Sequence, residues 1–424
     1  MVCVRRMLLY RGNFITTCRA RLFEARPEGE ATRLLAALLL LLCTAYSLIY
    51  FGVTADRAMS KPIGDFFGLW SCAKFLFDYP AAMIYDAPTL KAAQIALGMD
   101  PSISYPFPYP PSFLLALWPL GLLPWQVAYL LLIGATLGLF VWATGGSRWR
   151  SWTTLAAVVA PATTITIIAG QAGLLAAALM AGGFRLAERR PILAGVLLGL
   201  LTYKPQMGVL VPIALLAAGL WRTIAAAVAT LLALVFVTTI VFGWSIWPAW
   251  IAGTLAYSNQ FSAESGEIMH LMPTVFVALL RLHVAASAAQ LVQGIAALMA
   301  AAVVWDCFRR GATPLAAAAL MTATFLATPH AFVYDMPIVA AAVLWTTAEG
   351  QRAGQAFTVG ERLILILAFA APITLPPPEL RFPVAVLALV LLLGLIARRC
   401  RRLYPVAVSG FLPSWLSYRA AGSP

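Results

Sequence analysis

Apolar runs of about membrane-spanning length recur along the chain from Leu34 to Ile396, separated by short polar or proline-containing segments. A helix that crosses the hydrocarbon core of a bilayer needs about 20 apolar residues. The pattern therefore predicts an all-α polytopic membrane protein. About twelve transmembrane helices are expected, at 33–52, 126–143, 153–169, 171–187, 191–203, 206–220, 223–243, 287–308, 313–328, 334–347, 362–376 and 382–397.

Two further apolar stretches, 110–123 and 271–283, are too short to span and are rich in proline or flanked by polar residues. We expect them to form re-entrant or interfacial helices. The basic residues support this choice, because orientation follows the Lys and Arg of short loops. With both termini cytoplasmic, 22 of the 29 basic residues lie inside and 7 outside. If both stretches crossed, six Arg between Arg148 and Arg222 would move outside.

This topology predicts three parts. A cytoplasmic N-terminal tail (1–32) precedes a transmembrane domain (33–397), and a cytoplasmic C-terminal tail (398–424) follows it. The domain carries two long outer loops, 53–125 and 244–286. The N-terminal tail lacks the order of a signal peptide, because no small-residue cleavage site follows its apolar run. The sequence thus indicates a multi-pass protein of the inner (plasma) membrane.

The composition agrees with this class and narrows the chemistry. The chain is 62% hydrophobic and 11% charged, whereas soluble domains carry about 25% charged residues. The net charge of +13 is explained by Arg-rich cytoplasmic loops, so no nucleic-acid partner is expected. The sequence contains no P-loop, GxGxxG, HExxH or CxxC, and its three histidines lack metal-ligand spacing. We therefore expect neither a cofactor nor a metal.

Asp65 begins an amphipathic stretch in the first outer loop. Apolar and aromatic side chains follow it at roughly helical spacing, including Phe66, Phe67 and Trp70. Two roles remain open for its carboxylate. It can cap the start of the helix, or it can act as a general base at the membrane edge, with a pKa tuned by burial.

Other polar residues stand at helix boundaries on the same predicted side. Lys204 lies between two apolar runs, where a lysine must reach the headgroups, pair with another group or face a water-filled cavity, and where it could also bind a phosphate. Gln171 lies in a turn between two helices, as a hairpin cap or as part of a site. His330 ends a helix and suits a phosphate or a proton transfer. Asp335 can fix the tautomer of His330 or cap the next helix.

Asp86 stands in an Asp-Ala-Pro context typical of a turn, and Tyr109 lies in a proline-rich aromatic segment that can shape a loop or line a groove. The charge-based topology, which makes no use of these residues, brings Asp65, Gln171, Lys204 and His330 to one side and near one depth. This convergence predicts a polar site on the outer face.

The order of these motifs resembles glycosyltransferase family 87, whose members are integral membrane enzymes of the GT-C type. The resemblance extends over roughly residues 33–345. It rests on Asp-Phe-x-x-x-Trp-x-x-Ala from Asp65, Tyr-Asp at Tyr85, Tyr-Pro-Pro-x7-Pro-Leu-x-x-Leu-Pro from Tyr109, Gly-Gln at Gly170, Lys-Pro-Gln at Lys204 and Pro-His-x-x-x-Tyr-Asp from Pro329.

The resemblance implies a GT-C-like fold and a sugar transfer on the extracytoplasmic face. The donor would be a polyprenyl-phosphate hexose, with mannose the best-known case, and the acceptor a lipid-linked molecule or glycan, among the membrane lipids. Asp65 matches the family's catalytic position. Lys204 and His330 are our candidates for the donor phosphate, and one displacement implies inversion. We expect the substrate groove to include Trp70, Asp86, Tyr109, Gln171 and Asp335.

Two other functions use similar features. A transporter or flippase of lipid-linked envelope intermediates also needs intramembrane polar residues and broken helices, and inverted repeats would favour it. A scaffold protein of envelope synthesis needs only the membrane helices. Neither explains an outer loop that carries Asp65 together with Lys204 and His330 elsewhere on the same side.

Overall fold

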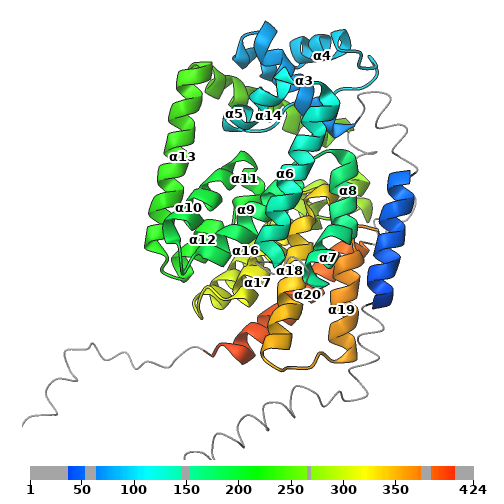
Figure 1. Ribbon diagram of the computed structural model, residues 1–424, viewed down its shortest axis with the longest axis vertical. Coiled ribbons are helices and arrows are strands. Elements are labelled where there is room, and N and C mark those ends of the chain that lie inside the picture. The colour runs from blue at the N-terminus through cyan, green and yellow to red at the C-terminus, as the bar shows by residue number, and fades with distance from the viewer. Residues whose placement is uncertain (1–36, 53–63, 146–151, 265–268, 374–382, 406–424) are drawn as a thin grey trace, which may run out of the picture. The chain divides into compact units, whose positions relative to one another are not determined.

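The computed structural model describes residues 37–52, 64–145, 152–264, 269–373 and 383–405 (Figure 1). The chain divides into two units, Met1–Ile49 and Tyr50–Pro424. The described residues of the first unit, 37–49, all lie in the helix Ala37–Gly52. The rest of this section concerns the second unit, in which every regular element of the described residues is helical.

The second unit is built from many short helices and a few long ones. In chain order they are α3 (Asp65–Asp78), η1 (Ala81–Tyr85), α4 (Ala87–Ala96), η2 (Pro111–Phe113), α5 (Leu114–Leu117), η3 (Trp118–Leu122), α6 (Trp125–Gly145), α7 (Trp152–Val159), α8 (Pro161–Ala169), α9 (Gly173–Leu186), α10 (Pro191–Leu200), η4 (Leu201–Tyr203), α11 (Pro205–Gly208), α12 (Val211–Ala217), α13 (Trp221–Phe242), α14 (Ile246–Glu264), η5 (Met269–Leu271), α15 (Val275–Arg281), α16 (Ala286–Phe308), α17 (Pro314–Ala327), η6 (Val333–Asp335), α18 (Pro337–Arg352), α19 (Val359–Ala370) and α20 (Val384–Leu403).

The predicted all-α membrane class is confirmed. Within the described residues, α6, α13 and α16 are long and apolar enough to cross a bilayer. The bent pair α7 and α8, which meet at 45°, would make a fourth crossing if the two helices form one span. The last predicted span, 382–397, lies largely in the 20-residue helix α20, and the other predicted spans are shorter or broken, as where 206–220 forms α11 and α12. The total of twelve spans stays a prediction.

Proline accounts for several of these breaks. It has no N–H to leave unpaired at a first helical turn, and its fixed φ suits that position. Accordingly it is the first residue of α8, α10, α11, α17 and α18. The stretch 110–123, predicted as a re-entrant or interfacial helix, is divided into η2, α5 and η3. In the second such stretch, 271–283, the helix α15 has seven residues.

α17 forms the buried centre of the unit and packs against α9, α16, α18 and α20. Every residue from 315 to 326 is buried, and many of them are Ala, so neighbouring backbones approach closely. Its 14 residues give a length of about 21 Å, less than the roughly 30 Å of a hydrocarbon core. As a single helix α17 is therefore too short to cross the core.

Glycine residues of α10 allow this helix to pack closely against α13. A Cβ added at Gly195 would lie 2.5 Å from the Ala226 Cβ, and one at Gly199 would lie 2.6 Å from the Thr230 Cβ. This is the small-xxx-small spacing that lets membrane helices pack without intervening side chains. The same spacing recurs on α6 at Gly134 and Gly138, where a Cβ would meet nothing within 4 Å.

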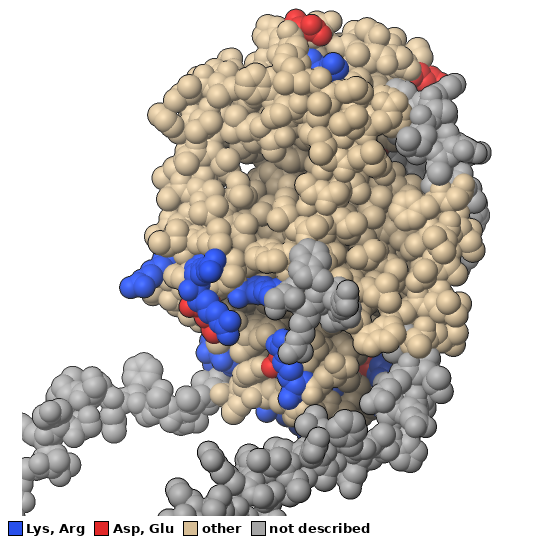
Figure 2. Space-filling view, in the orientation of Figure 1, with Lys and Arg blue, Asp and Glu red and all other residues tan. Residues whose placement is uncertain are grey.

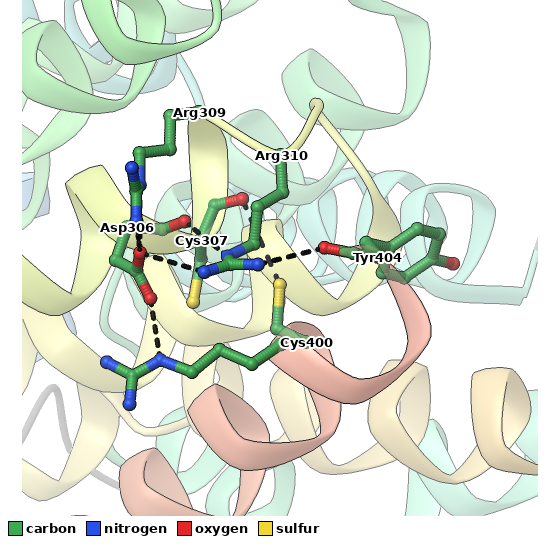
Figure 3. A network of polar contacts seen from close by, with 7 residues as sticks. Asp306, Cys307, Arg309, Arg310, Cys400 and Tyr404 are labelled. Atoms are coloured by element: carbon green, nitrogen blue, oxygen red, sulfur yellow. Dashed lines mark hydrogen bonds and ion pairs between the residues drawn. The ribbon is translucent and has the colours of Figure 1, made fainter. Parts of the chain in front are cut away.

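Charged side chains gather at one end of the unit. On the face drawn in Figure 2, most Lys and Arg lie at the lower end, whereas few charges lie at the opposite end, near α3 and α4. At the lower end, Asp306 accepts from Arg309 (2.6 Å), Arg310 (3.1 Å) and Arg401 (2.7 Å), and Arg310 also donates to the Tyr404 carbonyl (3.1 Å) (Figure 3). This network joins the ends of α16 and α20, and α20 continues past the predicted tail boundary at 397.

The glycine contacts generate a stability prediction. Gly195→Ala and Gly199→Ala should each destabilise the protein by about 1–3 kcal/mol, the usual cost of overpacking. The measurement is the thermal unfolding midpoint of the purified protein in detergent. Gly134→Ala and Gly138→Ala are the matched controls and should leave the midpoint unchanged or raise it, because Ala favours a helix over Gly. Equal losses at both pairs would contradict the proposed role of close α10–α13 packing.

Candidate functional site

Asp65 is the first residue of α3, but it does not cap that helix. The N-cap is Gly64, at φ 92°, and no side chain caps the helix. The Gly64 N–H donates to the Tyr105 hydroxyl at 3.2 Å. The Asp65 carboxylate instead accepts a hydrogen bond from the Gln171 side-chain amide, Nε2 to Oδ2, at 3.0 Å. Of the two roles open to this carboxylate, the structure therefore does not support capping.

Gln171 lies in the tight connection between α8 and α9, as predicted. Gly170 ends α8 in the left-handed conformation, with φ 68°, which glycine adopts without steric cost. A Cβ at Gly170 would lie 2.3 Å from the Phe66 Cβ, and one at Gly173 would lie 1.7 Å from the Tyr334 carbonyl oxygen. The two glycines thus let this connection fit between α3 and η6.

Tyr109 completes the contacts of the Gln171 amide. Its hydroxyl donates to Gln171 Oε1 at 2.9 Å, and its ring packs against Phe113 (5.1 Å between centroids) and Tyr203 (6.4 Å). The Tyr85 hydroxyl donates to the Tyr109 carbonyl at 2.8 Å. Burial raises the pKa of Tyr109 well above its usual value, so the hydroxyl keeps its proton and acts as a donor.

Lys204 forms a buried ion pair with Asp335, and their side chains are 3% and 0% exposed. Lys204 follows η4, and the Asp335 carboxylate also accepts the Phe332 N–H at 3.2 Å. The ammonium lies over the Tyr334 ring (5.0 Å to the centroid) and the Tyr109 ring (5.9 Å). Of the roles open to Lys204, the structure therefore shows pairing and does not support a reach toward the headgroups.

Further contacts join these segments. The Tyr203 hydroxyl donates to the Ala172 carbonyl at 2.6 Å, and the Thr166 hydroxyl donates to the Tyr334 carbonyl at 2.8 Å. Distant parts of the chain thus meet at one place. We call the five side chains of Asp65, Tyr109, Gln171, Lys204 and Asp335 the polar cluster.

The electrostatics of the cluster suit a carboxylate that exchanges a proton. Burial raises the pKa of Asp65, and the Gln171 hydrogen bond and the charge of Lys204 act in the opposite direction. The N-termini of α3, α9 and α18 all belong to segments that contribute to the cluster. Because helix N-termini carry partial positive charge, they and Lys204 offset part of the negative charge of the two carboxylates of the cluster.

Three predicted residues lie outside the cluster. Asp86 caps α4, accepting the Thr89 N–H at 3.1 Å. Trp70 donates its indole N–H to the Leu123 carbonyl at 3.1 Å. His330 is exposed in the segment between α17 and η6, and its backbone N–H donates to the Thr328 hydroxyl at 3.2 Å. Their roles in binding substrate stay predictions.

Sequence reasoning gave no role to Tyr203 or to Tyr334, which it named only as part of the Pro-His-x-x-x-Tyr-Asp motif, although both contact the cluster. A signal was available, because each is an aromatic residue directly before a charged one, at Lys204 and Asp335, within an otherwise apolar region. Aromatic faces attract cations. The structure uses one of these rings, that of Tyr334, against the ammonium itself.

Apolar helices around a largely buried polar cluster, built from the connections at helix ends, are typical of an integral membrane protein with a polar site. Comparison with protein families identifies the class of membrane protein to which the chain belongs. The sequence model of Glycosyltransferase family 87 matches residues 107–329, more than half of the chain. The chain belongs to this family and is therefore a membrane glycosyltransferase, which confirms the resemblance noted from the motifs.

The matched region contains Tyr109, Gln171 and Lys204, whereas Asp65 precedes it and Asp335 follows it. No curated protein and no solved structure matched the chain. The contacts of the cluster are therefore the evidence that joins Asp65 and Asp335 to the region covered by the family match.

The ion pair generates a second stability prediction. Lys204→Met and Asp335→Asn should each cost about 3–5 kcal/mol, because one buried charge is left without its partner. The double variant should recover much of that loss, since it removes both charges. Thermal unfolding in detergent gives the comparison.

Arg352→Met is the control for this prediction. Its ion pair with Glu349 spans 3.5 Å and the Arg352 side chain is 72% exposed, and exposed pairs are worth at most about 1 kcal/mol. A double variant as unstable as the sum of its single variants would show that the two residues do not act as a pair.

Proposed function

We propose that this glycosyltransferase transfers a hexose, mannose in the first instance, from a polyprenyl-phosphate donor to a lipid-linked or glycan acceptor. The transfer takes place on the extracytoplasmic face of the inner (plasma) membrane. One observation carries the proposal. A carboxylate from the first outer segment, Asp65, is held by Gln171, which lies 106 residues away in sequence, and it lies within the electrostatic influence of Lys204.

Asp65 is the proposed general base. The acceptor hydroxyl oxygen attacks the anomeric carbon and forms the new glycosidic bond, and its proton passes to the Asp65 carboxylate. The bond between the anomeric carbon and the phosphate oxygen breaks, and the electron pair leaves with the polyprenyl phosphate. A single displacement inverts the anomeric centre. The raised pKa of Asp65 favours this role, because a buried carboxylate binds the proton more strongly than an exposed one.

Lys204 and His330 are the proposed phosphate contacts. An ammonium has three N–H donors, and the bond to Asp335 uses one, so Lys204 can bind a phosphate oxygen without leaving its partner. His330 lies five positions before Asp335 in the same connection. The nearby helix N-termini add partial positive charge that stabilises the departing phosphate.

The remaining predicted residues are proposed to shape the substrate groove. Tyr109, Gln171 and Asp335 belong to the polar cluster. Trp70 and Asp86 stabilise α3 and α4 beside it, through their contacts with Leu123 and Thr89. No step of the proposed transfer requires a metal or a cofactor.

The test of this function is Asp65→Asn. Membranes from cells that express the protein supply the endogenous acceptor, and radiolabelled polyprenyl-phosphate mannose or glucose is added as donor. The asparagine keeps the shape of the side chain but is not a base, so transfer should fall by about 100-fold or more, the usual contribution of a general base. The measurement is label recovered in glycolipid and glycan fractions.

Asp78→Asn is the matched control, because Asp78 is an exposed aspartate at the other end of the same helix. It should transfer sugar like the wild type. Retained activity in a folded Asp65→Asn protein would show that Asp65 is not the base. Absence of transfer from every polyprenyl-phosphate sugar by the wild type would refute the donor class.

A further inference from the structure

The side-chain amide of Gln171 forms hydrogen bonds with two different residues. Its Nε2 donates to Asp65 Oδ2 at 3.0 Å, and its Oε1 accepts from the Tyr109 hydroxyl at 2.9 Å. Gln171 is 7% exposed, and its two partners Asp65 and Tyr109 are half-buried. The contact between Gln171 and Asp65 is thus one link of a chain of hydrogen bonds.

The chemistry of the groups gives this chain one direction. An ionised carboxylate only accepts hydrogen bonds, so it must face the NH₂ end of the amide. The carbonyl end then faces Tyr109 and requires a donor. The Tyr109 hydroxyl meets that requirement, because burial raises its pKa and keeps it protonated. Reversing the amide would place a carbonyl oxygen against a carboxylate and leave the phenol without an acceptor.

The backbone around Gln171 is held as firmly as its side chain. The Ala172 carbonyl accepts from Tyr203 at 2.6 Å, and Gly170 and Gly173 leave no space for a Cβ against Phe66 and Tyr334. A side chain on such a connection has little freedom to follow a substrate. It is well suited to hold another side chain in place.

We propose that Gln171 is a positioning residue, which, oriented by Tyr109, binds one oxygen of Asp65 and leaves the other oxygen to take the acceptor's proton. This inference rests on the proposed function and revises the expectation that Gln171 and Tyr109 contact the substrate. The amide stabilises the ionised carboxylate, so it also sets the pH above which the base is available.

The test compares four variants. Gln171→Leu removes both hydrogen bonds, Gln171→Glu sets a second carboxylate against Asp65, and Tyr109→Phe removes the donor that orients the amide. Tyr404→Phe is the matched control. It loses a tyrosine hydroxyl that bonds to Glu349, a contact that does not involve the Gln171 connection or the cluster.

The first readout needs no substrate. A hydrophobic carbodiimide reacts with protonated carboxyl groups, so the pH dependence of Asp65 labelling, followed by peptide mass spectrometry, reports its protonation. The labelling midpoint should move to higher pH in Gln171→Leu and Tyr109→Phe, because the hydrogen bond that lowers the pKa is lost or weakened. It should move furthest in Gln171→Glu, in which two carboxylates repel each other. Tyr404→Phe should match the wild type.

The second readout is transfer kinetics across the same pH range. Gln171→Leu should lower kcat at neutral pH by roughly 10- to 100-fold, the scale of a misplaced catalytic group, with little change in the KM for acceptor. The acidic limb of its pH–rate profile should move to higher pH, because a general base acts only above its pKa.

The outcomes separate the inference from the proposed function. An unchanged labelling midpoint in a stably folded Gln171→Leu protein would overturn the positioning role, whatever the activity. A raised KM with an unchanged acidic limb would mean that Gln171 contacts the substrate, which also overturns it. If the wild type transfers no sugar, the proposed function fails, while the labelling midpoints still decide whether Gln171 controls Asp65.

Discussion

The buried pair of Lys204 and Asp335 is the interaction on which the arrangement of the site depends. Its members are 131 residues apart in sequence, and each would be costly to bury alone. Their attraction joins the connection between α10 and α11 to the segment that follows α17. Tyr109 and Tyr334 face the ammonium with their rings, so the charge also orients the aromatic residues that surround it.

Close backbone contacts, together with the ion pair, fix the arrangement of the site. Gly170 and Gly173 bring the α8–α9 connection against α3 and η6, and this connection carries Gln171 to Asp65. The site therefore combines one strong electrostatic contact with several places where only hydrogen fits at Cα. Both features restrict motion, and restricted motion is what a catalytic carboxylate requires.

Many of the helices and of the site residues could be predicted from the sequence, whereas the contacts between the site residues depend on the tertiary structure. The prolines at Pro205 and Pro329 marked helix breaks, and the polar residues beside them became candidates for the site. The distribution of Lys and Arg predicted that Asp65, Gln171 and Lys204 lie on one side of the membrane. Pairing was not predictable. Nothing local shows that Lys204 bonds to Asp335, or that Gln171 bonds to both Asp65 and Tyr109, because each bond joins segments brought together only by helix packing.

Trp70 and Asp86 illustrate the opposite difficulty. Both stood in motifs that pointed to a groove, and the hydrogen bonds that they form are with Leu123 and Thr89. A motif records which residues accompany a function, without saying which of them contact the ligand and which support the fold. Only the observed partners distinguish the two.

The enclosed helix α17 has a consequence for how the protein forms. Its side chains meet other helices on all sides, so lipid never acts as its solvent in the finished protein. A short Ala-rich segment gains little from lipid by itself, since insertion is favoured by Leu, Ile, Phe and Val. Its stable place in the protein therefore depends on α16 and α18, which pack against it. During synthesis these three helices should behave as one cooperative unit, and the site that begins where α17 ends can form only after they have associated.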